Sequence, residues 1–267
     1  IRLGVRDLFE CPTVVELAGA VRRATVHSLR PLVAKARPEH IPLSLAQQRI
    51  WFLDRFDRGA DGYNMPTAVR LSGALDVGAL RAALRDVVGR HEVLRTTFPD
   101  SPDGPRQQIH PVGEAFADFA AIDVAEARLD ERIAELAAGP FDLAAELPIR
   151  ATLLRTNPGE HVLVLVVHHI ACDGWSIAPL ARDIGTAYEA RRRSAAPDWQ
   201  PLPVQYADFA MWQREVLGAD GAEIRYAING LLSLTPDGGP LLGETPEVKG
   251  LWSAAAVWIW PIRDSTS

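Results

Sequence analysis

The chain has 267 residues and a formal net charge of -6 at pH 7, with 48% hydrophobic and 23% charged residues. These values are typical of a globular protein and argue against disordered, collagen-like and coiled-coil classes. The acidic balance provides no positive field for phosphates or anionic lipids, so a nucleic-acid or membrane-surface function is disfavoured.

A capping-box pair, Thr13 and Glu16, predicts the start of a short helix whose apolar residues follow helical spacing. A single helix of this size does not hold itself together in water, so we expect the rest of its domain to lie upstream. The next segment, 27–42, contains three prolines and scattered basic residues. This composition predicts a linker between domains.

From residue 43 onward, helix and strand signals are mixed along the chain. Three helix caps are expected, at Ser44 with Gln47 in the capping-box position, at Asp76 and at Ser176. Segments in which apolar and polar residues alternate separate these helices and predict short strands. The mixture predicts an α/β sandwich with a helical layer.

The strongest strand signal is a hairpin, in which the apolar stretches 149–154 and 162–167 flank a turn containing Pro158 and Gly159. The second stretch is apolar at every position, so we predict a central strand that is covered on both faces. It is also the longest strongly apolar run, and it is far shorter than the roughly 20 residues that a membrane-spanning helix needs.

The candidate site is the segment 168–174, HHIACDG, which follows this strand directly. An imidazole, with a reference pKa near 6.5, is a suitable base for an amine or alcohol that attacks an acyl group. Because successive strand side chains point to opposite faces, only one of His168 and His169 can face a given cavity. From these residues alone, two structural histidines beside an ordinary Asp173-Gly174 turn are the simpler interpretation.

The cysteines suggest neither a disulfide framework nor a metal site. Cys11 and Cys172 are too few for such a framework and lack metal-ligand spacing, so a reducing, cytoplasmic setting is expected. The position of Cys172 beside two histidines raises the alternative of a thiol nucleophile. Adjacent residues do not readily form an in-line Cys/His pair, so a packing role is favoured.

Four segments resemble the first four signature motifs of the condensation domains of nonribosomal peptide synthetases, and they occur in the order of that family. They are SLAQQRIW at 44–51, RHEVLRTTF at 90–98, HHIACDGWS at 168–176 and YADFAMW at 206–212. The segment YNMP at 63–66 is also similar, and the resemblance covers about 41–217. Four motifs in series are a much more specific signal than one.

This resemblance implies an α/β fold similar to chloramphenicol acetyltransferase, a two-layer sandwich of which the chain would form one lobe after a short helical N-terminal remnant. It implies an acyltransferase in which a carrier-bound amine attacks a carrier-bound aminoacyl or peptidyl thioester. Both substrates would ride on the 4′-phosphopantetheine arms of peptidyl carrier domains, beside an adenylation domain of the same synthetase. The chain itself would bind no cofactor.

The resemblance also implies roles for individual residues. The second histidine of the motif, here His169, is the catalytic one in that family, as a base or as a group that positions the amine. His168 would pack internally, and Asp173 would hold the loop through an arginine. Gly174 would allow close backbone approach and could bring an amide toward the developing oxyanion. Among the motif arginines, Arg95 is expected nearest the site.

Other signals flank this region. Residues 3–18 look like the tail of a peptidyl carrier domain without the Gly-Gly-x-Ser attachment site. The segment 228–259 looks like part of a flavin-dependent dimethylglycine or sarcosine oxidase without a phosphate-binding glycine loop. The expected organisation is a carrier remnant at 1–26, a linker at 27–42, a truncated condensation lobe at 43–220 and an unrelated segment, from a fusion or an assembly artefact, at 221–267.

Several alternatives remain open. The later motifs of the family have no counterpart after Leu217, so we expect little or no condensation by the isolated chain. An epimerisation-type relative, which uses the same motif on one carrier, and a free acetyltransferase-like enzyme are the enzymatic alternatives. A heterocyclising relative is disfavoured because both histidines are present. The alternative that is not an enzyme is a catalytically inactive piece that only docks carriers.

Overall fold

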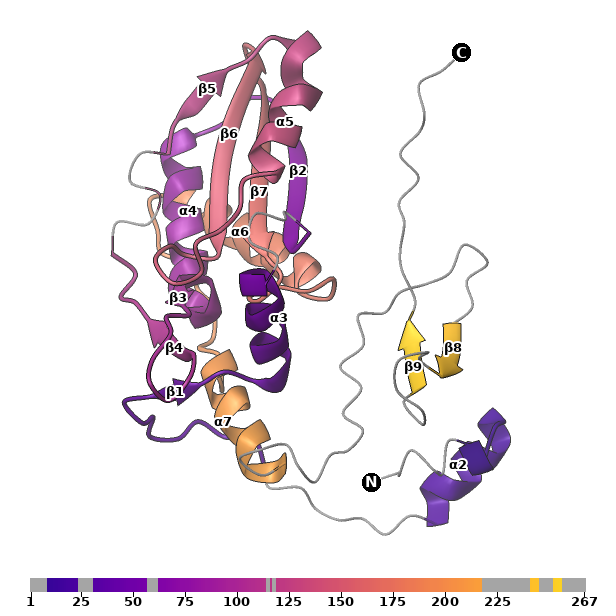
Figure 1. The fold of residues 1–267 in the computed structure, drawn as a ribbon. Helices are drawn as coiled ribbons and strands as arrows, with labels where there is room; N and C mark the ends of the chain where they lie inside the picture. The colour runs from indigo at the N-terminus through magenta and orange to yellow at the C-terminus, as the bar shows by residue number, and fades with distance from the viewer. Residues whose placement is uncertain are drawn as a thin grey trace, which may run out of the picture. The chain divides into compact units, whose positions relative to one another are not determined.

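A computed structural model describes residues 9–23, 31–56, 62–113, 116, 119–217, 241–244 and 252–255. The chain divides into two compact units, Ile1–Glu223 and Ile224–Ser267. The first unit contains a mixed α/β body built around one main sheet (Figure 1). Among the described helices, none is both long enough and apolar enough to cross a membrane.

The main sheet has four strands in the order β2-β7-β6-β5. Its strands are β2 (Asn64–Ser72), β5 (Ala121–Asp123), β6 (Ile149–Asn157) and β7 (Glu160–His168). Both β2 and β6 run antiparallel to β7, whereas β5 runs parallel to β6. The predicted hairpin and the predicted central strand are therefore confirmed. The hairpin turn consists of Pro158 and Gly159, and glycine suits it because Gly159 has a φ of 79°.

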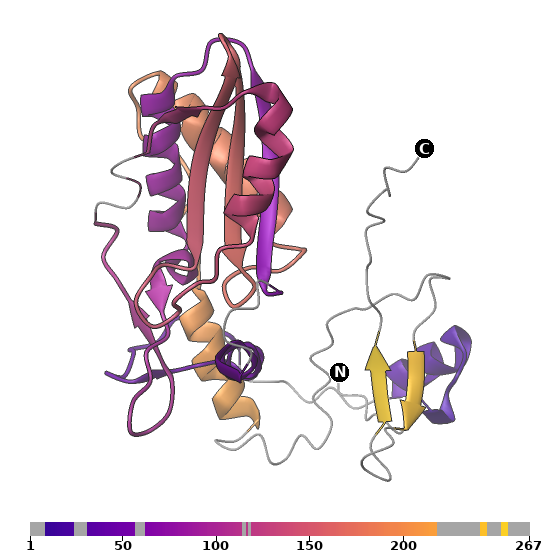
Figure 2. The same ribbon diagram turned by 45° about the horizontal axis from the view of Figure 1, so that its top comes forward.

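The side chains of β7 are buried alternately on the two faces of the sheet. One face holds Val162, Val164 and Val166, and the other holds Leu163, Leu165 and Val167. Helices α4 (Val77–Arg90) and α6 (Ile177–Arg192) pack side by side against the second set, and α5 (Leu129–Ala137) packs against the first (Figure 2). Each such buried side chain stabilises the fold by about 1.5–3 kcal/mol.

A second, smaller sheet and two more helices complete the body. The sheet has the order β1-β4-β3 and consists of β1 (Ile41–Pro42), β3 (Thr96–Thr97) and β4 (Arg106–Ile109). The helices are α3 (Leu45–Phe56) and α7 (Tyr206–Leu217), and the short 3-10 helices are η1 (Glu92–Arg95) and η2 (Glu126–Arg128). Helix α7, which comes last in the sequence of this body, contacts β1 and η1, which come early in it.

Two of the predicted helix starts are confirmed by their hydrogen bonds. The amide of Ser44 donates to Oε1 of Gln47 and the amide of Gln47 donates to Oγ of Ser44, both at 3.1 Å. The carboxylate of Asp76 accepts from the amide of Ala79 at 2.8 Å. These bonds satisfy backbone donors that have no partner within the first turn of a helix.

Toward the two ends of the chain the structure describes short elements. Helix α2 (Val14–Arg23) begins with the predicted capping box, because the amides of Thr13 and Glu16 each donate to the other side chain. Strands β8 (Leu241–Glu244) and β9 (Trp252–Ala255) pair antiparallel. The rest of the segment 228–259 lies outside the described residues, so its resemblance to flavin oxidases stays a prediction.

Part of the predicted linker 27–42 is bound to the domain body. The guanidinium of Arg37 donates to both carboxylate oxygens of Asp208 at 3.2 Å, and the Asp208 side chain is only 2% exposed. Lys35 pairs with Glu215 at 2.6 Å at the surface. Since a buried carboxylate needs a partner, the Arg37–Asp208 contact ties the end of this segment to α7.

We expect Arg37→Ala to lower the free energy of unfolding by about 2 kcal/mol, because the buried carboxylate of Asp208 loses its ionic partner. The matched control, Lys35→Ala, removes an exposed ion pair and should cost less than about 1 kcal/mol. Urea denaturation followed by circular dichroism measures both values. Equal losses in the two variants would contradict the assignment of Arg37 as the residue that fixes this segment.

Candidate functional site

The two histidines of the motif lie in different environments at the end of β7. His168 is the last residue of the strand and is 1% exposed, whereas His169 begins the following turn and is partly exposed. The amide of His169 donates to the carbonyl of Tyr63 at 2.8 Å, so the chain stays tied to the segment before β2. This arrangement fits the expectation that one histidine packs inside while the other can face a cavity.

The ring of His168 is enclosed by aromatic and polar groups. The ring of Phe141 meets it edge-on with centroids 5.7 Å apart, and the ring of Tyr63 lies at 6.1 Å. Its Nδ1 accepts a hydrogen bond from the amide of Ile170 at 3.2 Å. In the neutral imidazole the proton must then lie on Nε2, and Oδ1 of Asp54 is 3.4 Å from that nitrogen.

The electrostatics of this contact follow from burial. Burial, with a smaller contribution from the neighbouring His169, lowers the pKa of His168 to about 4. Burial also raises the pKa of the Asp54 carboxyl above its ordinary value, with a smaller contribution from Asp142. Desolvation thus disfavours the charged form of both groups. The contact is a neutral imidazole N–H that faces a carboxyl oxygen, rather than an ion pair with a charged histidine.

Asp173 and Ser176 form a reciprocal pair at the start of α6. Oδ1 of Asp173 accepts from the amide and hydroxyl of Ser176 at 2.9 and 2.5 Å, and the amide of Asp173 donates to Oγ of Ser176 at 3.2 Å. Ser176 is the N-cap residue of α6, as predicted, but its side chain makes no cap hydrogen bond to the helix. Among the described residues the carboxylate of Asp173 bonds this serine, and its expected contact with an arginine stays a prediction. These bonds fix the turn that leads into the first residue of α6.

Gly174 lies exposed in the same turn. A Cβ placed there would meet no described atom within 4 Å, and the backbone does not adopt the left-handed region. The packing of the described residues therefore gives no reason for glycine at this position. The expected role of Gly174, to let another group approach the backbone closely, stays a prediction.

Cys172, which lies in the motif, and Arg95, which was expected near it, both have contacts that fit a structural role. Burial raises the pKa of the Cys172 thiol to about 11, so the thiol is protonated at neutral pH, which fits a packing role. Arg95 was expected nearest the site, but its guanidinium donates to the carbonyl of His110 and lies 3.5 Å from Glu92. These contacts join Arg95, the last residue of η1, to the first turn of η1 and to the residue after β4.

The remaining motifs form a scaffold around the main sheet. Oγ of Ser44 lies 3.0 Å from the hydroxyl oxygen of Tyr206, which joins the first motif to the fourth. Nε of Arg90 and Nε2 of His91 lie 3.0 and 2.8 Å from the same carboxylate oxygen of Asp183 on α6. The second motif is thus tied to the helix that follows the histidines.

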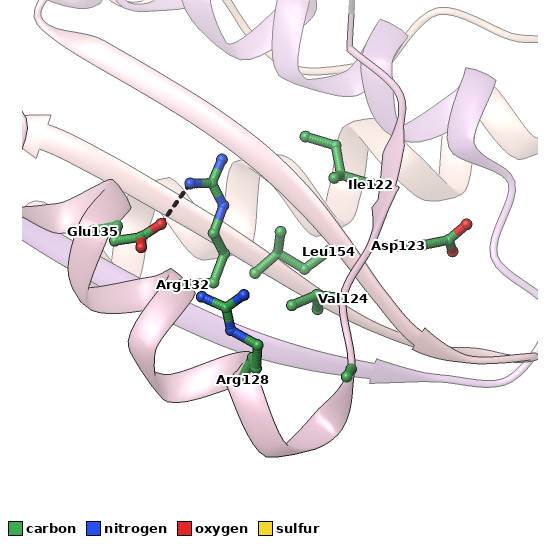
Figure 3. A pocket seen from close by; sticks show the side chains of 8 residues that line it. Ile122, Asp123, Val124, Arg128, Arg132, Glu135 and Leu154 are labelled. Atoms are coloured by element: carbon green, nitrogen blue, oxygen red, sulfur yellow. Dashed lines mark hydrogen bonds and ion pairs between the residues drawn. The ribbon is translucent and has the colours of Figure 1, made fainter.

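A pocket of about 310 Å³ lies elsewhere, between β5 and α5 (Figure 3). Its floor includes Leu154, which pairs with Val162 on β7, so the pocket is about 20 Å from His168 along that strand. Its charges are balanced by pairs such as Arg132 and Glu135 at 2.7 Å. Within the described residues, no three His, Cys, Asp or Glu side chains cluster in a way that could hold a metal ion.

Sequence reasoning missed Asp54 and Phe141 as neighbours of His168. A signal for Asp54 was present, because it follows Ile50 by four residues and Trp51 by three, and both of these pack against the core. A charged residue on the buried side of an amphipathic helix indicates a site or a partner. Phe141 lies in an irregular segment after α5, where no periodic pattern could reveal its contact.

We predict that His168 makes the folded chain less stable as the pH falls from 7 to 5. Its pKa is about 4 in the folded chain and near 6.5 when unfolded, so the unfolded chain binds a proton that the folded chain does not. The contribution is complete above about pH 6.5 and is lost as the pH falls toward 4, by about 2 kcal/mol at pH 5.

Urea denaturation at pH 7 and pH 5 measures this effect. The loss of unfolding free energy between the two values should shrink by about 2 kcal/mol in His168→Gln. The control His40→Gln removes an exposed histidine and separates the burial of His168 from the loss of an imidazole as such. An identical pH dependence in His168→Gln and the unmodified chain would contradict a lowered pKa for His168.

Comparison with protein families and sequences gives a consistent result. The family described as the condensation domain matches residues 37–224. The chain is 50% identical over 217 residues to the dimodular nonribosomal peptide synthase of Bacillus subtilis, and 49% identical over 227 residues to the isonitrile lipopeptide synthase of Mycobacterium tuberculosis. Each match covers 81% of this chain but only 9% of the relative.

Solved structures show the same fold. The X-domain from teicoplanin biosynthesis is 40% identical with a TM-score of 0.67, and the match covers 74% of this chain and 43% of that chain. The first condensation domain of the calcium-dependent antibiotic synthetase has a TM-score of 0.57 at 23% identity, covering 71% and 45%. The predicted fold class is confirmed, and the chain spans less than half of either solved chain.

Proposed function

Since this chain belongs to the condensation-domain family, we propose that it supplies the histidine-bearing half of an acyltransferase that forms amide bonds in a nonribosomal peptide synthetase. The observation that carries the proposal is the His168–His169 pair at the end of a strand covered on both faces, with only His169 partly exposed. This geometry leaves one imidazole available to substrates.

In the proposed reaction, the amine of an acceptor attacks the carbonyl carbon of a donor thioester. His169 takes a proton from the attacking amine, or holds the amine in place by a hydrogen bond. The tetrahedral intermediate then collapses, the C–S bond breaks, and the departing thiolate receives the proton. An amide bond and a free thiol are the products, so no oxidant or metal is required by the balance of the reaction.

The turn after His169 would serve the same reaction. Asp173 has an architectural role in this proposal, because its bonds to Ser176 fix the turn at the start of α6. Gly174, with open space around its Cα, would let a thioester approach the backbone, where an amide could stabilise the oxyanion. His168 stays neutral and supports the strand end from inside.

The substrates and partners are part of the proposal as well. The donor and acceptor would be aminoacyl or peptidyl groups on the 4′-phosphopantetheine arms of carrier domains, and an adenylation domain of the same synthetase would load them. The carrier arm is therefore a substrate of this site rather than a resident cofactor. The setting would be cytoplasmic, with Cys11 and Cys172 as free thiols.

A binding role without catalysis is the second candidate. It is favoured by the likeness to the X-domain from teicoplanin biosynthesis, for which a complex with OxyB has been solved. In this case the chain would dock a partner protein and leave the thioester intact. The epimerisation-type alternative differs from both because it would exchange the α-proton of a single carrier-bound aminoacyl group with solvent.

A chimera tests these functions directly. Residues 37–217 of this chain replace the matching part of the condensation domain in the Bacillus subtilis synthase, and mass spectrometry follows dipeptide transfer between loaded carriers. We expect the chimera to transfer, and His169→Ala to slow transfer by about 100-fold or more. The control Cys172→Ala should transfer as the parent chimera does, and the isolated chain should show little or no transfer.

Three outcomes would contradict the proposal. Transfer that survives His169→Ala would remove the role of this histidine. A folded chimera that binds loaded carriers without transfer would favour the docking role. Incorporation of deuterium from solvent at the α-carbon of the donor, without peptide formation, would favour the epimerisation-type reaction.

A further inference from the structure

Asp54 occupies an uncommon place for a carboxyl group. It lies on the side of α3 that carries Ile50 and Trp51 into the core, and its side chain is only 21% exposed. Its Oδ1 lies 3.4 Å from Nε2 of His168. A carboxyl group that gives up most of its hydration needs a hydrogen-bonding partner in return. The geometry offers that partner in the imidazole of His168.

The imidazole has the complementary need. Because Nδ1 of His168 accepts from the amide of Ile170, Nε2 carries the ring proton and is a buried donor. Among the described residues, no well-aligned acceptor completes a hydrogen bond to this nitrogen. Oδ1 of Asp54 lies 3.4 Å from this nitrogen, within hydrogen-bonding reach but without the alignment of a completed bond.

The position of the His168 ring affects the strand end from which His169 emerges. The backbone amide of His168 donates to the carbonyl of Pro148 at 2.9 Å, and the amide of His169 donates to the carbonyl of Tyr63 at 2.8 Å. The ring itself packs between Phe141 and Tyr63. A change of ring orientation would therefore press on Tyr63, whose carbonyl anchors His169.

We propose that Asp54 is a positioning residue of this site: its carboxyl group accepts a hydrogen bond from Nε2–H of His168, fixes that ring, and so sets where His169 is presented. The lowered pKa of His168 fits a neutral imidazole that donates a hydrogen bond, rather than a charged partner in an ion pair. The effect on transfer rests on the proposed function, whereas the hydrogen bond does not.

Nuclear magnetic resonance of the 267-residue chain with ¹⁵N-labelled histidine tests the hydrogen bond. We expect the unmodified chain to show His168 as the Nε2–H tautomer with a slowly exchanging ring proton. Asp54→Leu removes the acceptor and should speed exchange of that proton by about 10-fold or more. Asp54→Asn keeps a carbonyl oxygen at the same place and should retain slow exchange.

The matched control is Asp100→Leu. Asp100 pairs with Arg55, the residue after Asp54, so this variant removes a carboxylate beside the same helix without touching His168. Unchanged exchange in a folded Asp54→Leu chain would overturn the proposal. Equal acceleration in Asp100→Leu would overturn it too, because the effect would then come from general loosening of α3.

The chimera described above tests the consequence for transfer. We expect Asp54→Leu to lower kcat by about 10-fold with little change in KM for the loaded carrier, and Asp54→Asn to recover most of the loss. If Asp54→Leu speeds exchange of the ring proton but leaves transfer at its full rate, the positioning role is overturned. If the parent chimera is inactive while the exchange rates are as expected, the proposed function is overturned. The Asp54–His168 hydrogen bond would still be supported in that case.

Discussion

The burial of β7 on both faces is the constraint on which the rest of this structure depends. Its antiparallel partners fix the register to the last residue, where His168 lies opposite Asn64. Because side chains alternate along a strand, this register sends His168 into the core and leaves His169 at the edge of the turn. A slip of one residue would bury His169 and expose His168. The same register therefore sets both the burial of the strand and which histidine can belong to the site.

Contacts between distant segments hold the elements around this strand. The first motif meets the fourth through Ser44 and Tyr206, and the second motif meets α6 through Arg90 and Asp183. These polar groups are largely buried, so they tolerate few alternative arrangements. The motifs other than the histidine segment thus form a linked scaffold around the sheet, and the acyl-transfer chemistry proposed for the chain depends on one turn.

Local patterns made much of the fold predictable. The caps at Ser44 and Asp76 and the apolar run of β7 each depend on residues close in sequence, and each is confirmed. The contacts that sequence could not supply join distant residues, as in the 171-residue separation of Arg37 and Asp208. The bond between Asp173 and Ser176 is local, but the resemblance pointed to an arginine partner and no sequence pattern singled out this serine as the partner.

The strand that is covered on both faces exposes His169 in part and buries His168. Modification by diethyl pyrocarbonate, located by tandem mass spectrometry, tests this claim because the reagent attacks accessible imidazole nitrogens. We expect His169 to be modified in the folded chain and His168 to react only after unfolding in urea. Equal modification of both histidines in the folded chain would contradict it.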